Sequence, residues 1–496
     1  MAADYLAPES SAERPLRVAI VGAGPAGIYA ADVLHKSGTP VSIDLFEKLP
    51  APYGLIRYGV APDHPRIKGI VTALRQVLSR DNIRFLGNVE YGVDIKLDDL
   101  RRHYDAVVFT TGADKDRALD IPGIDLPGSH GAADFVSWFD GHPDVSRDWP
   151  LEAESIAVIG AGNVALDVAR MLAKTADELL STEIPDNVYR GLKASPATDI
   201  HVFGRRGPAQ AKFTPLELRE LDHSPSVEVI VNPEDIEYDE GSIAARKGDK
   251  QVEMVARVIE GYALRDPGQA PRRIHLHFFE SPVEVLGDGK VEAIRTERTE
   301  LTGDGNVRGT GQLRDWPVQA VYRAVGYLSR ELVDLPWDPR SGTIPHHAGR
   351  VVGMDGQHVP GVYVNGWIKR GPVGLIGHTK GDALETIGSL LEDLPTLPKA
   401  ADPSPESVIA LLEERGIKYT DWEGWGLLDA HELDLGTAEG RERVKVVSRE
   451  EMTDICRRVS AAVHSGPEGE SVEEALEAVH EQLEAKVEAK ADAARS

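Results

Sequence analysis

The order of apolar and polar positions predicts two similar strand–turn–helix units. Residues 17–34 read RVAIVGAGPAGIYAADVL, and residues 155–172 read SIAVIGAGNVALDVARML. In each copy an apolar run ends in Gly-Ala-Gly and is followed by small residues with helical spacing. A short β-branched run bounded by glycines is typical of a strand buried on both faces of a parallel sheet. The pattern therefore predicts an α/β fold with two dinucleotide-binding units.

A second apolar strand closes each unit, YDAVVFTTGA at 104–113 and VQAVYRAVGY at 318–327. The sequence after Gly326 is rich in turns, and from about residue 401 it is polar with a helical pattern. Near the C-terminus, apolar residues recur at steps of three or four: Val472, Leu476, Val479, Leu483 and Val487. This spacing predicts an amphipathic helix on the protein's own surface.

The first glycine loop has the spacing G-x-G-x-x-G, at Gly22, Gly24 and Gly27. The first glycine permits a tight turn, the second lets the backbone approach a pyrophosphate, and the third lets helix and strand pack closely. Glu47 ends the next strand-like run, VSIDLFE. A carboxylate there accepts hydrogen bonds from ribose hydroxyls and repels a 2′-phosphate, so the first unit is predicted to bind FAD or NAD.

The second loop has Gly160, Gly162 and Ala165 in the same spacing. The next strand-like run, DIHVF, ends in Gly204 followed by Arg205 and Arg206, so two cations stand where the first unit has an acid. Arginine binds phosphate with two parallel hydrogen bonds, and a pair suits a dianion. The most economical interpretation is FAD in the first unit and NADP in the second. The stretch 177–198 makes the distance from loop to arginines longer than the usual 20 or so residues.

The length, net charge and cysteine count of the chain limit its possible classes and partners. A chain of 496 residues is too long for one core, and a formal charge of −26 argues against nucleic acid as the main partner. No secretory signal and no membrane-spanning run are visible. The single cysteine, Cys456, cannot form an internal disulfide, a redox-active pair or a cluster cage. We therefore expect a reducing, cytoplasmic location, no metal, and electron chemistry from a bound cofactor.

Several longer motifs together resemble one family. They are GAGPAG, PYGLIRYGVAPDHPRIK (52–68), FLGNV (85–89), GAGNVALDVAR (160–170), GRRGP (204–208), FTPLELREL (213–221) and GWIKRGPVGLIG (366–377). The chain resembles the adrenodoxin reductase-like ferredoxin–NADP⁺ reductases from about residue 16 to about 450. The resemblance implies a glutathione-reductase-like pair of Rossmann-type domains, with the NADP domain (113–330) inserted into an FAD domain (1–112 and 331–496).

The resemblance also implies site residues. The FAD contacts that it adds to the first glycine loop are Ala26, Glu47, Leu55, Val89, Trp367, Gly374, Leu375 and Ile376. The NADP contacts, together with Gly160, are Ala161, Gly162, Asn163, Val164, Arg205, Arg206, Glu217 and Gly374. His64 and Glu220 match polar residues near the contact between flavin and nicotinamide, where they are expected to orient the nicotinamide. The sequence departs from the family at 378–380, where HTK replaces the commoner Thr-Asn-Lys.

The implied activity is hydride transfer from NADPH to FAD, followed by single-electron transfer to a ferredoxin. Ferredoxins are usually acidic, so docking requires a local basic face. The candidate cations are Arg246, Lys247, Lys250, Arg257, Arg272 and Arg273. Two alternatives remain open, a flavin monooxygenase or other diaphorase-type reductase, and a non-catalytic nucleotide sensor.

Overall fold

The structure is a computed structural model that describes residues 14–266, 268–374 and 376–458, without the side chains of Arg66 and Ile376. Contacts divide the chain into two compact units. Within the described residues, the first unit comprises 14–54, 70–113 and 329–425, and the second comprises 55–69, 114–328 and 426–458. The predicted helix with Val472, Leu476, Val479, Leu483 and Val487 lies outside the described residues.

A seven-stranded sheet forms the centre of the first unit, in the order β16-β17-β18-β4-β1-β2-β3. Its strands are β1 (Leu16–Val21), β2 (Val41–Phe46), β3 (Ile83–Leu86), β4 (Ala106–Phe109), β16 (His346–His347), β17 (Arg350–Val352) and β18 (His358–Val364). The strands from β18 to β3 are parallel, and β16 and β17 extend the edge in antiparallel fashion. Every residue of β1 is buried, as the apolar run predicted.

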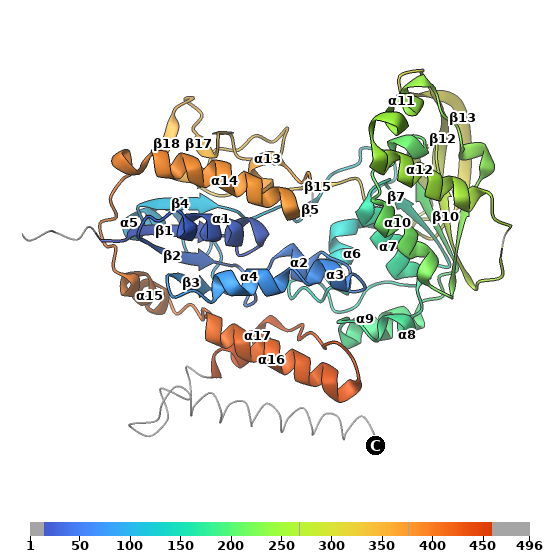
Figure 1. Cartoon of the computed structure of the whole chain (residues 1–496). Helices are drawn as coiled ribbons and strands as arrows, with labels where there is room; N and C mark the ends of the chain where they lie inside the picture. The colour runs from blue at the N-terminus through green and yellow to red at the C-terminus, as the bar shows by residue number, and fades with distance from the viewer. Residues whose placement is uncertain (1–13, 267, 375, 459–496) are drawn as a thin grey trace, which may run out of the picture. The chain divides into compact units, whose positions relative to one another are not determined.

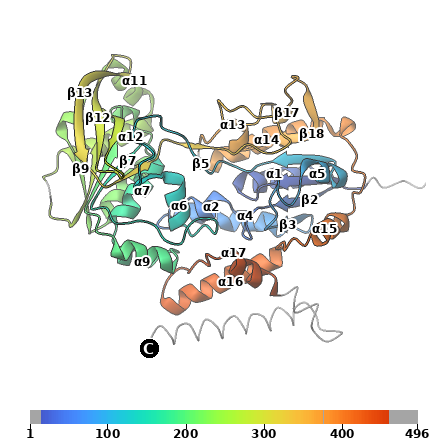
Figure 2. The same cartoon turned by 180° about the vertical axis from the view of Figure 1, so that it is seen from behind.

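Helices cover both faces of this sheet. The helices that begin in the first unit are α1 (Pro25–Lys36), α4 (Val71–Leu78), α5 (Leu97–His103), α13 (Trp367–Arg370), α14 (Ile376–Glu392), α15 (Pro405–Glu414) and α16 (Trp422–Glu439). Helix α1 packs against both α14 and α4 on one face (Figure 1). Helix α5 connects β3 to β4 and lies on the opposite face, which is turned toward the viewer in Figure 2.

The second unit is built on a six-stranded parallel sheet, in the order β6-β14-β7-β8-β10-β9. Its strands are β6 (Ser129–Gly131), β7 (Ser155–Ile159), β8 (Asp199–Phe203), β9 (Val227–Val231), β10 (Arg272–His277) and β14 (Ala320–Arg323). A three-stranded antiparallel sheet has β11 (Glu280–Leu286), β12 (Ala293–Leu301) and β13 (Val307–Pro317). Strands β5 (Lys115–Asp116) and β15 (Tyr327–Leu328) form a separate pair.

The remaining helices belong to the second unit. They are α2 (Leu55–Tyr58), α3 (Pro65–Lys68), α6 (Ala132–Phe139), α7 (Asn163–Ala173), α8 (Ala176–Leu179), α9 (Asp186–Ala194), α10 (Pro215–Glu220), α11 (Glu240–Gly248), α12 (Lys250–Ala263) and α17 (Arg449–Cys456). Helices α8 and α9 occupy the long stretch between α7 and β8. They explain why the arginine pair follows its glycine loop at more than the usual distance.

The alternation of side chains along β7 shows why both faces of this sheet are apolar. Ile156 and Val158 belong to the large core shared with α7, whereas Ala157 and Ile159 belong to a second core with Val285 of β11 and Ile294 of β12. Successive strand residues point to opposite faces, so a continuous apolar run is required when both are covered. This arrangement confirms the prediction of two Rossmann-type units. No helix in the described ranges is long and apolar enough to cross a membrane.

Candidate functional site

The first glycine loop joins β1 to α1 and packs tightly against β4. Gly22 has φ +112°, and a Cβ atom there would lie 2.7 Å from the carbonyl oxygen of Thr110. A Cβ atom on Gly27 would lie 2.0 Å from the carbonyl oxygen of Gly22. At Gly24, by contrast, the nearest atom would be the Cα of Gly54 at 3.8 Å. The loop is therefore closed against the protein at its first and third glycines and open at its second, where a pyrophosphate needs access.

Glu47 lies immediately after β2 with its carboxylate held by the backbone. One oxygen accepts a hydrogen bond from the Ala23 amide at 2.9 Å, and the other from the Leu49 amide at 3.1 Å. Burial raises the pKa of Glu47, although the backbone donors act in the opposite direction. Each carboxylate oxygen accepts more than one hydrogen bond, so both retain capacity for ribose hydroxyls. The loop and this acid fit the adenosine half of FAD.

Other predicted FAD contacts lie around the same loop in the first unit. The Asn365 side chain donates to the Ala26 carbonyl at 2.9 Å. Trp367, two residues further on, is half-buried at the start of α13. The Val89 amide donates to the Glu47 carbonyl at 2.9 Å.

The remaining predicted FAD contacts are dispersed. Gly374 is exposed in the first unit with φ +89°, Leu375 lies outside the described residues, and Ile376 is the first residue of α14. Leu55 belongs to the second unit. The structure therefore groups Ala26, Glu47 and Val89 at the loop and leaves the others as predictions from the resemblance.

The second loop, between β7 and α7, is likewise closed against the protein at its first glycine and open at its second. A Cβ atom on Gly160 would lie 2.3 Å from the Ala324 carbonyl oxygen, whereas one on Gly162 would meet nothing within 4 Å. No side chain caps the N-terminus of α7 at Gly162, so the first backbone amides of the helix are available to an anion. Asn163 accepts a hydrogen bond from the Thr214 amide at 2.8 Å, which ties the loop to the segment before α10.

Arg205 and Arg206 follow β8 in a pocket of about 310 Å³. The Thr299 hydroxyl donates to the Arg205 carbonyl at 2.8 Å, and the Phe279 amide donates to the Arg206 carbonyl at 3.3 Å. These contacts hold the backbone of the two arginines in place. Their guanidinium groups remain available to a ligand. Among the described residues, neither guanidinium has an ion-pair or hydrogen-bond partner.

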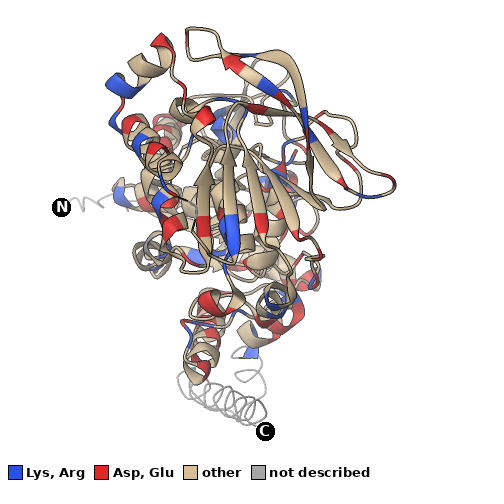
Figure 3. Cartoon of the chain, turned by 90° about the vertical axis from the view of Figure 1, so that its right-hand side faces the viewer, with Lys and Arg blue, Asp and Glu red and all other residues tan. Residues whose placement is uncertain are grey.

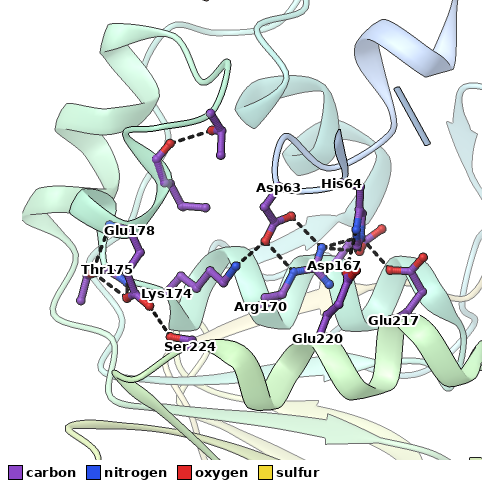
Figure 4. A network of polar contacts seen from close by, with 12 residues as sticks. Asp63, His64, Asp167, Arg170, Lys174, Thr175, Glu178, Glu217, Glu220 and Ser224 are labelled. Atoms are coloured by element: carbon purple, nitrogen blue, oxygen red, sulfur yellow. Dashed lines mark hydrogen bonds and ion pairs between the residues drawn. The ribbon is translucent and has the colours of Figure 1, made fainter. Parts of the chain in front are cut away.

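His64 is the centre of a polar network within the second unit (Figure 4). Its Nδ1 lies 2.8 Å from Glu220 Oε2, and its Nε2 lies 2.7 Å from Glu217 Oε2 and 2.9 Å from Asp167 Oδ1. The three predicted residues His64, Glu217 and Glu220 are thus brought together. The His64 side chain is 4% exposed and that of Glu220 is 25% exposed, so the carboxylate of Glu220 is the more accessible group.

The charges in this network favour a protonated His64. Burial acts to lower its pKa, but hydrogen bonds to Asp167, Glu217 and Glu220 raise it to about 11. The guanidinium of Arg170 lies 2.7 Å from Nε2 and opposes protonation, but it is outnumbered by the three carboxylates. His64, Glu217 and Glu220 also place ligand atoms within 4.8 Å of one another, as a metal site would. An imidazolium next to a guanidinium does not bind a metal ion, so we interpret the group as an ion-pair network.

Three members of the network were missed by sequence reasoning: Asp63, Asp167 and Arg170. Arg170 donates to Asp63 through Nε at 2.7 Å, and Lys174 donates to the same carboxylate at 2.7 Å. Asp167 and Arg170 stand one turn apart on α7, in the otherwise apolar run VALDVARML. Two charged residues on one face of an otherwise apolar helix are unusual, and this pattern in the sequence could have indicated a buried polar network.

Three of the six cations of the predicted basic face already form ion pairs, and a fourth, Arg272, is held by backbone carbonyls. Arg246 pairs with Glu253 at 2.7 Å and with Glu260 at 2.6 Å. Arg257 also pairs with Glu253, and Arg273 pairs with Asp199. Arg272 donates to backbone carbonyls at the end of α7, including that of Lys174 at 2.9 Å.

Lys247 and Lys250 are the exceptions in this group. Both are exposed, and neither side chain has a partner among the described residues. Figure 3 shows both charge signs on the helices and on the sheet of this unit. The surface charge of this unit is therefore mixed, and of the six predicted cations only Lys247 and Lys250 have no partner among the residues that the structure describes.

These two loops, one followed by a buried acid and the other by paired arginines, define a class of oxidoreductases that bind a flavin and a pyridine nucleotide. The family model described as pyridine nucleotide-disulphide oxidoreductase matches residues 16–199. The chain is 40% identical over 460 residues to NADPH-ferredoxin reductase FprA of Mycobacterium tuberculosis, covering 89% of this chain and 99% of that protein. It is 38% identical over 463 residues to the mitochondrial NADPH:adrenodoxin oxidoreductase of Bos taurus, covering 89% and 92%.

A solved structure of M. tuberculosis FprA in complex with NADPH superposes with a TM-score of 0.83, at 40% identity, covering 89% of this chain and 99% of that one. The chain therefore belongs to the family of NADPH-ferredoxin reductases and NADPH:adrenodoxin oxidoreductases. The resemblance found in the sequence is confirmed.

Proposed function

We propose that this protein is an FAD-dependent NADPH:ferredoxin oxidoreductase. The observation that carries the proposal is the contrast between the two loops. Glu47 in the first unit accommodates an unphosphorylated ribose, whereas the free guanidinium groups of Arg205 and Arg206 in the second suit a 2′-phosphate. FAD is thereby assigned to the first loop and NADPH to the second. The proposed domain limits are 1–112 with 331–496 for FAD and 113–330 for NADP, whereas contacts group residues 55–69 and 426–458 with the second unit.

The redox chemistry would be supplied by the bound flavin, which would accept a hydride from NADPH and pass the two electrons one at a time to an iron–sulfur protein. The protein's own residues bind and orient. The amides at the start of α1 and α7 receive the pyrophosphates, and the open sides of Gly24 and Gly162 admit them. Hydride transfer depends on this orientation because reacting atoms must meet in a defined geometry.

His64 and Glu220 are proposed to act on the nicotinamide end of NADPH. A protonated His64 has no lone pair to remove a proton, so general-base catalysis is not its role. Its Nδ1–H donates to the carboxylate of Glu220, which holds that group in place. Glu220 then accepts a hydrogen bond from the carboxamide of the nicotinamide, and His64 positions it.

The partner is proposed to be a separate ferredoxin that docks near α11. Lys247 and Lys250 support this proposal, because a ferredoxin is an acidic protein and these two lysines are free to meet it. A reducing, cytoplasmic location is part of the same proposal and rests on the single thiol, Cys456.

Anaerobic addition of NADPH to the purified FAD-loaded protein tests the function. We expect bleaching of the flavin absorbance, followed by its recovery when oxidised ferredoxin is added. Binding of both nucleotides without bleaching would instead support a nucleotide sensor. Bleaching followed by substrate oxygenation would support a monooxygenase.

A further inference from the structure

The pocket that holds Arg205 and Arg206 has a second wall, which no pattern in the sequence predicts. It is contributed by the antiparallel sheet, mainly by the hairpin of β12 and β13. Besides the two arginines, the residues around the pocket are Ser281, Glu297, Thr299, Asn306, Val307, Arg308 and Gly309. A third guanidinium, that of Arg308, therefore borders the same space of about 310 Å³.

Backbone contacts hold this wall in place relative to the arginine pair. Thr299 on β12 donates from its hydroxyl to the Arg205 carbonyl at 2.8 Å and from its amide to the Phe279 carbonyl at 2.8 Å. The Phe279 amide in turn donates to the Arg206 carbonyl. Phe279 has φ +58°, a conformation that non-glycine residues rarely adopt and that persists only where the surroundings impose it. The turn and the hairpin thus form one anchored structure around the pocket.

Arg308 is available to an incoming anion. It lies opposite Glu300 in the β12–β13 register, and its Nε is 2.6 Å from Glu300 Oε1. The side chains are 72% and 48% exposed, so water screens the pair and it contributes little to stability. A phosphate dianion offers a stronger charge-assisted contact than one exposed carboxylate, and arginine binds it with two donors at once.

Glu297 limits how anionic a ligand the pocket accepts. It borders the same space, and its Oε1 accepts a hydrogen bond from the Gly311 amide at 2.9 Å. Its charge opposes a dianion and cancels one of the two positive charges of Arg205 and Arg206, and Arg308 restores that charge when it takes part. The net charge of the pocket therefore depends on Glu297 of β12 and Arg308 of β13 as well as on the arginine pair.

We propose that Arg308 is a third ligand of the 2′-phosphate of NADPH, and so a residue that determines the preference for NADPH over NADH. This inference rests on the proposed function, in which Arg205 and Arg206 bind that phosphate. Arg308 leaves Glu300 when the nucleotide arrives and closes the pocket from the hairpin side.

Calorimetric titration of the FAD-loaded protein with 2′,5′-ADP and with 5′-ADP tests the inference without relying on turnover. We expect Arg308→Gln to weaken 2′,5′-ADP binding by about three- to tenfold and to leave 5′-ADP binding unchanged. Glu297→Gln keeps an oxygen for the Gly311 amide and should strengthen 2′,5′-ADP binding, by up to about fivefold. Arg314→Gln, on the same strand but outside this pocket, is the matched control and should change neither.

The outcomes separate this inference from the function on which it rests. A loss with Arg205→Ala but none with Arg308→Gln overturns the role of Arg308 and leaves the proposed function standing. No loss with either variant overturns both. Equal losses for the two ligands with Arg308→Gln would show a general effect on the hairpin and would also overturn the inference.

Discussion

The imidazole Nδ1 of His64 and the carboxylate Oε2 of Glu220 lie 2.8 Å apart, although 155 intervening residues separate them in sequence. On its other side the same imidazole meets Glu217 and Asp167. A buried histidine surrounded by three carboxylates remains charged, which makes it a fixed donor and not a proton shuttle at neutral pH. The role proposed for the pair, to orient the nicotinamide, follows from this relationship.

The charge on His64 predicts a pH-dependent stability difference between the wild-type protein and His64→Gln. The folded pKa of about 11 lies above the unfolded value of about 6.5, so the folded state binds the extra proton more tightly. This stabilisation is fully present below pH 6.5 and is lost as the pH rises toward 11. The difference in melting temperature should therefore be largest near pH 6 and should shrink by pH 10.

Thermal unfolding at a series of pH values measures this difference. The exposed His223 provides a control, since His223→Gln should leave the melting temperature unaltered at each pH. A difference for His64→Gln that stays constant, or grows, between pH 6 and pH 10 would contradict the ion-pair network.

The arginine pair predicts a loss of affinity that is specific to the phosphorylated nucleotide. Arg205→Ala or Arg206→Ala should weaken NADPH binding by about 1–3 kcal/mol, the range for a hydrogen bond to a charged group. NADH binding should change little and FAD should be retained, because neither involves the 2′-phosphate. Steady-state kinetics with the two nucleotides measure the effect. Equal losses for both would contradict the assignment and favour a solvated turn.

The two glycines of the second loop predict different defects. Gly160→Ala brings a Cβ atom to 2.3 Å from the Ala324 carbonyl oxygen, so overpacking should destabilise the fold by about 1–3 kcal/mol. Gly162→Ala meets no protein atom within 4 Å, and as a helix N-cap change it should cost at most about 1 kcal/mol. Its methyl group should instead obstruct the pyrophosphate and weaken NADPH binding. Unfolding curves and nucleotide titrations on both variants measure stability and NADPH affinity separately. Normal NADPH binding by Gly162→Ala would contradict the prediction.

For Lys247 and Lys250 we predict a defect in electron transfer to the protein partner and not to a small acceptor. Reversing both to Glu should slow ferredoxin-dependent cytochrome reduction, because the encounter with an acidic partner loses its attraction. Ferricyanide reduction should be unaffected. Lys290→Glu, which reverses another exposed lysine in the turn between β11 and β12, serves as the control. Equal losses with ferredoxin and ferricyanide would contradict docking at these lysines.

Local features of the nucleotide sites could be predicted from the sequence because each depends on adjacent residues. A glycine spacing defines a turn, and the residue after the next strand reaches the ribose. Gly22, Glu47 and Arg205 were therefore identifiable without a structure. The apolar runs of β1 and β7 were equally clear, since strands covered on both faces leave no polar alternation.

Electrostatic partners could not be predicted in this way. Arg246 was expected to be free for docking, but in the structure it is neutralised by Glu253 and Glu260 on the following helix. Likewise Arg308 has no sequence pattern that connects it to Arg205, and only the hairpin of β12 and β13 places it at the pocket.

The sequence by itself determined the fold class and the two glycine loops, and it carries the prediction of which ribose each loop accepts. Tertiary structure alone decided the surroundings of His64, which come from three separate segments at 63–64, 167–170 and 217–220. The reason is physical: backbone turns and strand periodicity are local properties of the chain. The charge state of a buried group depends on every charge within a few ångströms, whichever part of the chain supplies it.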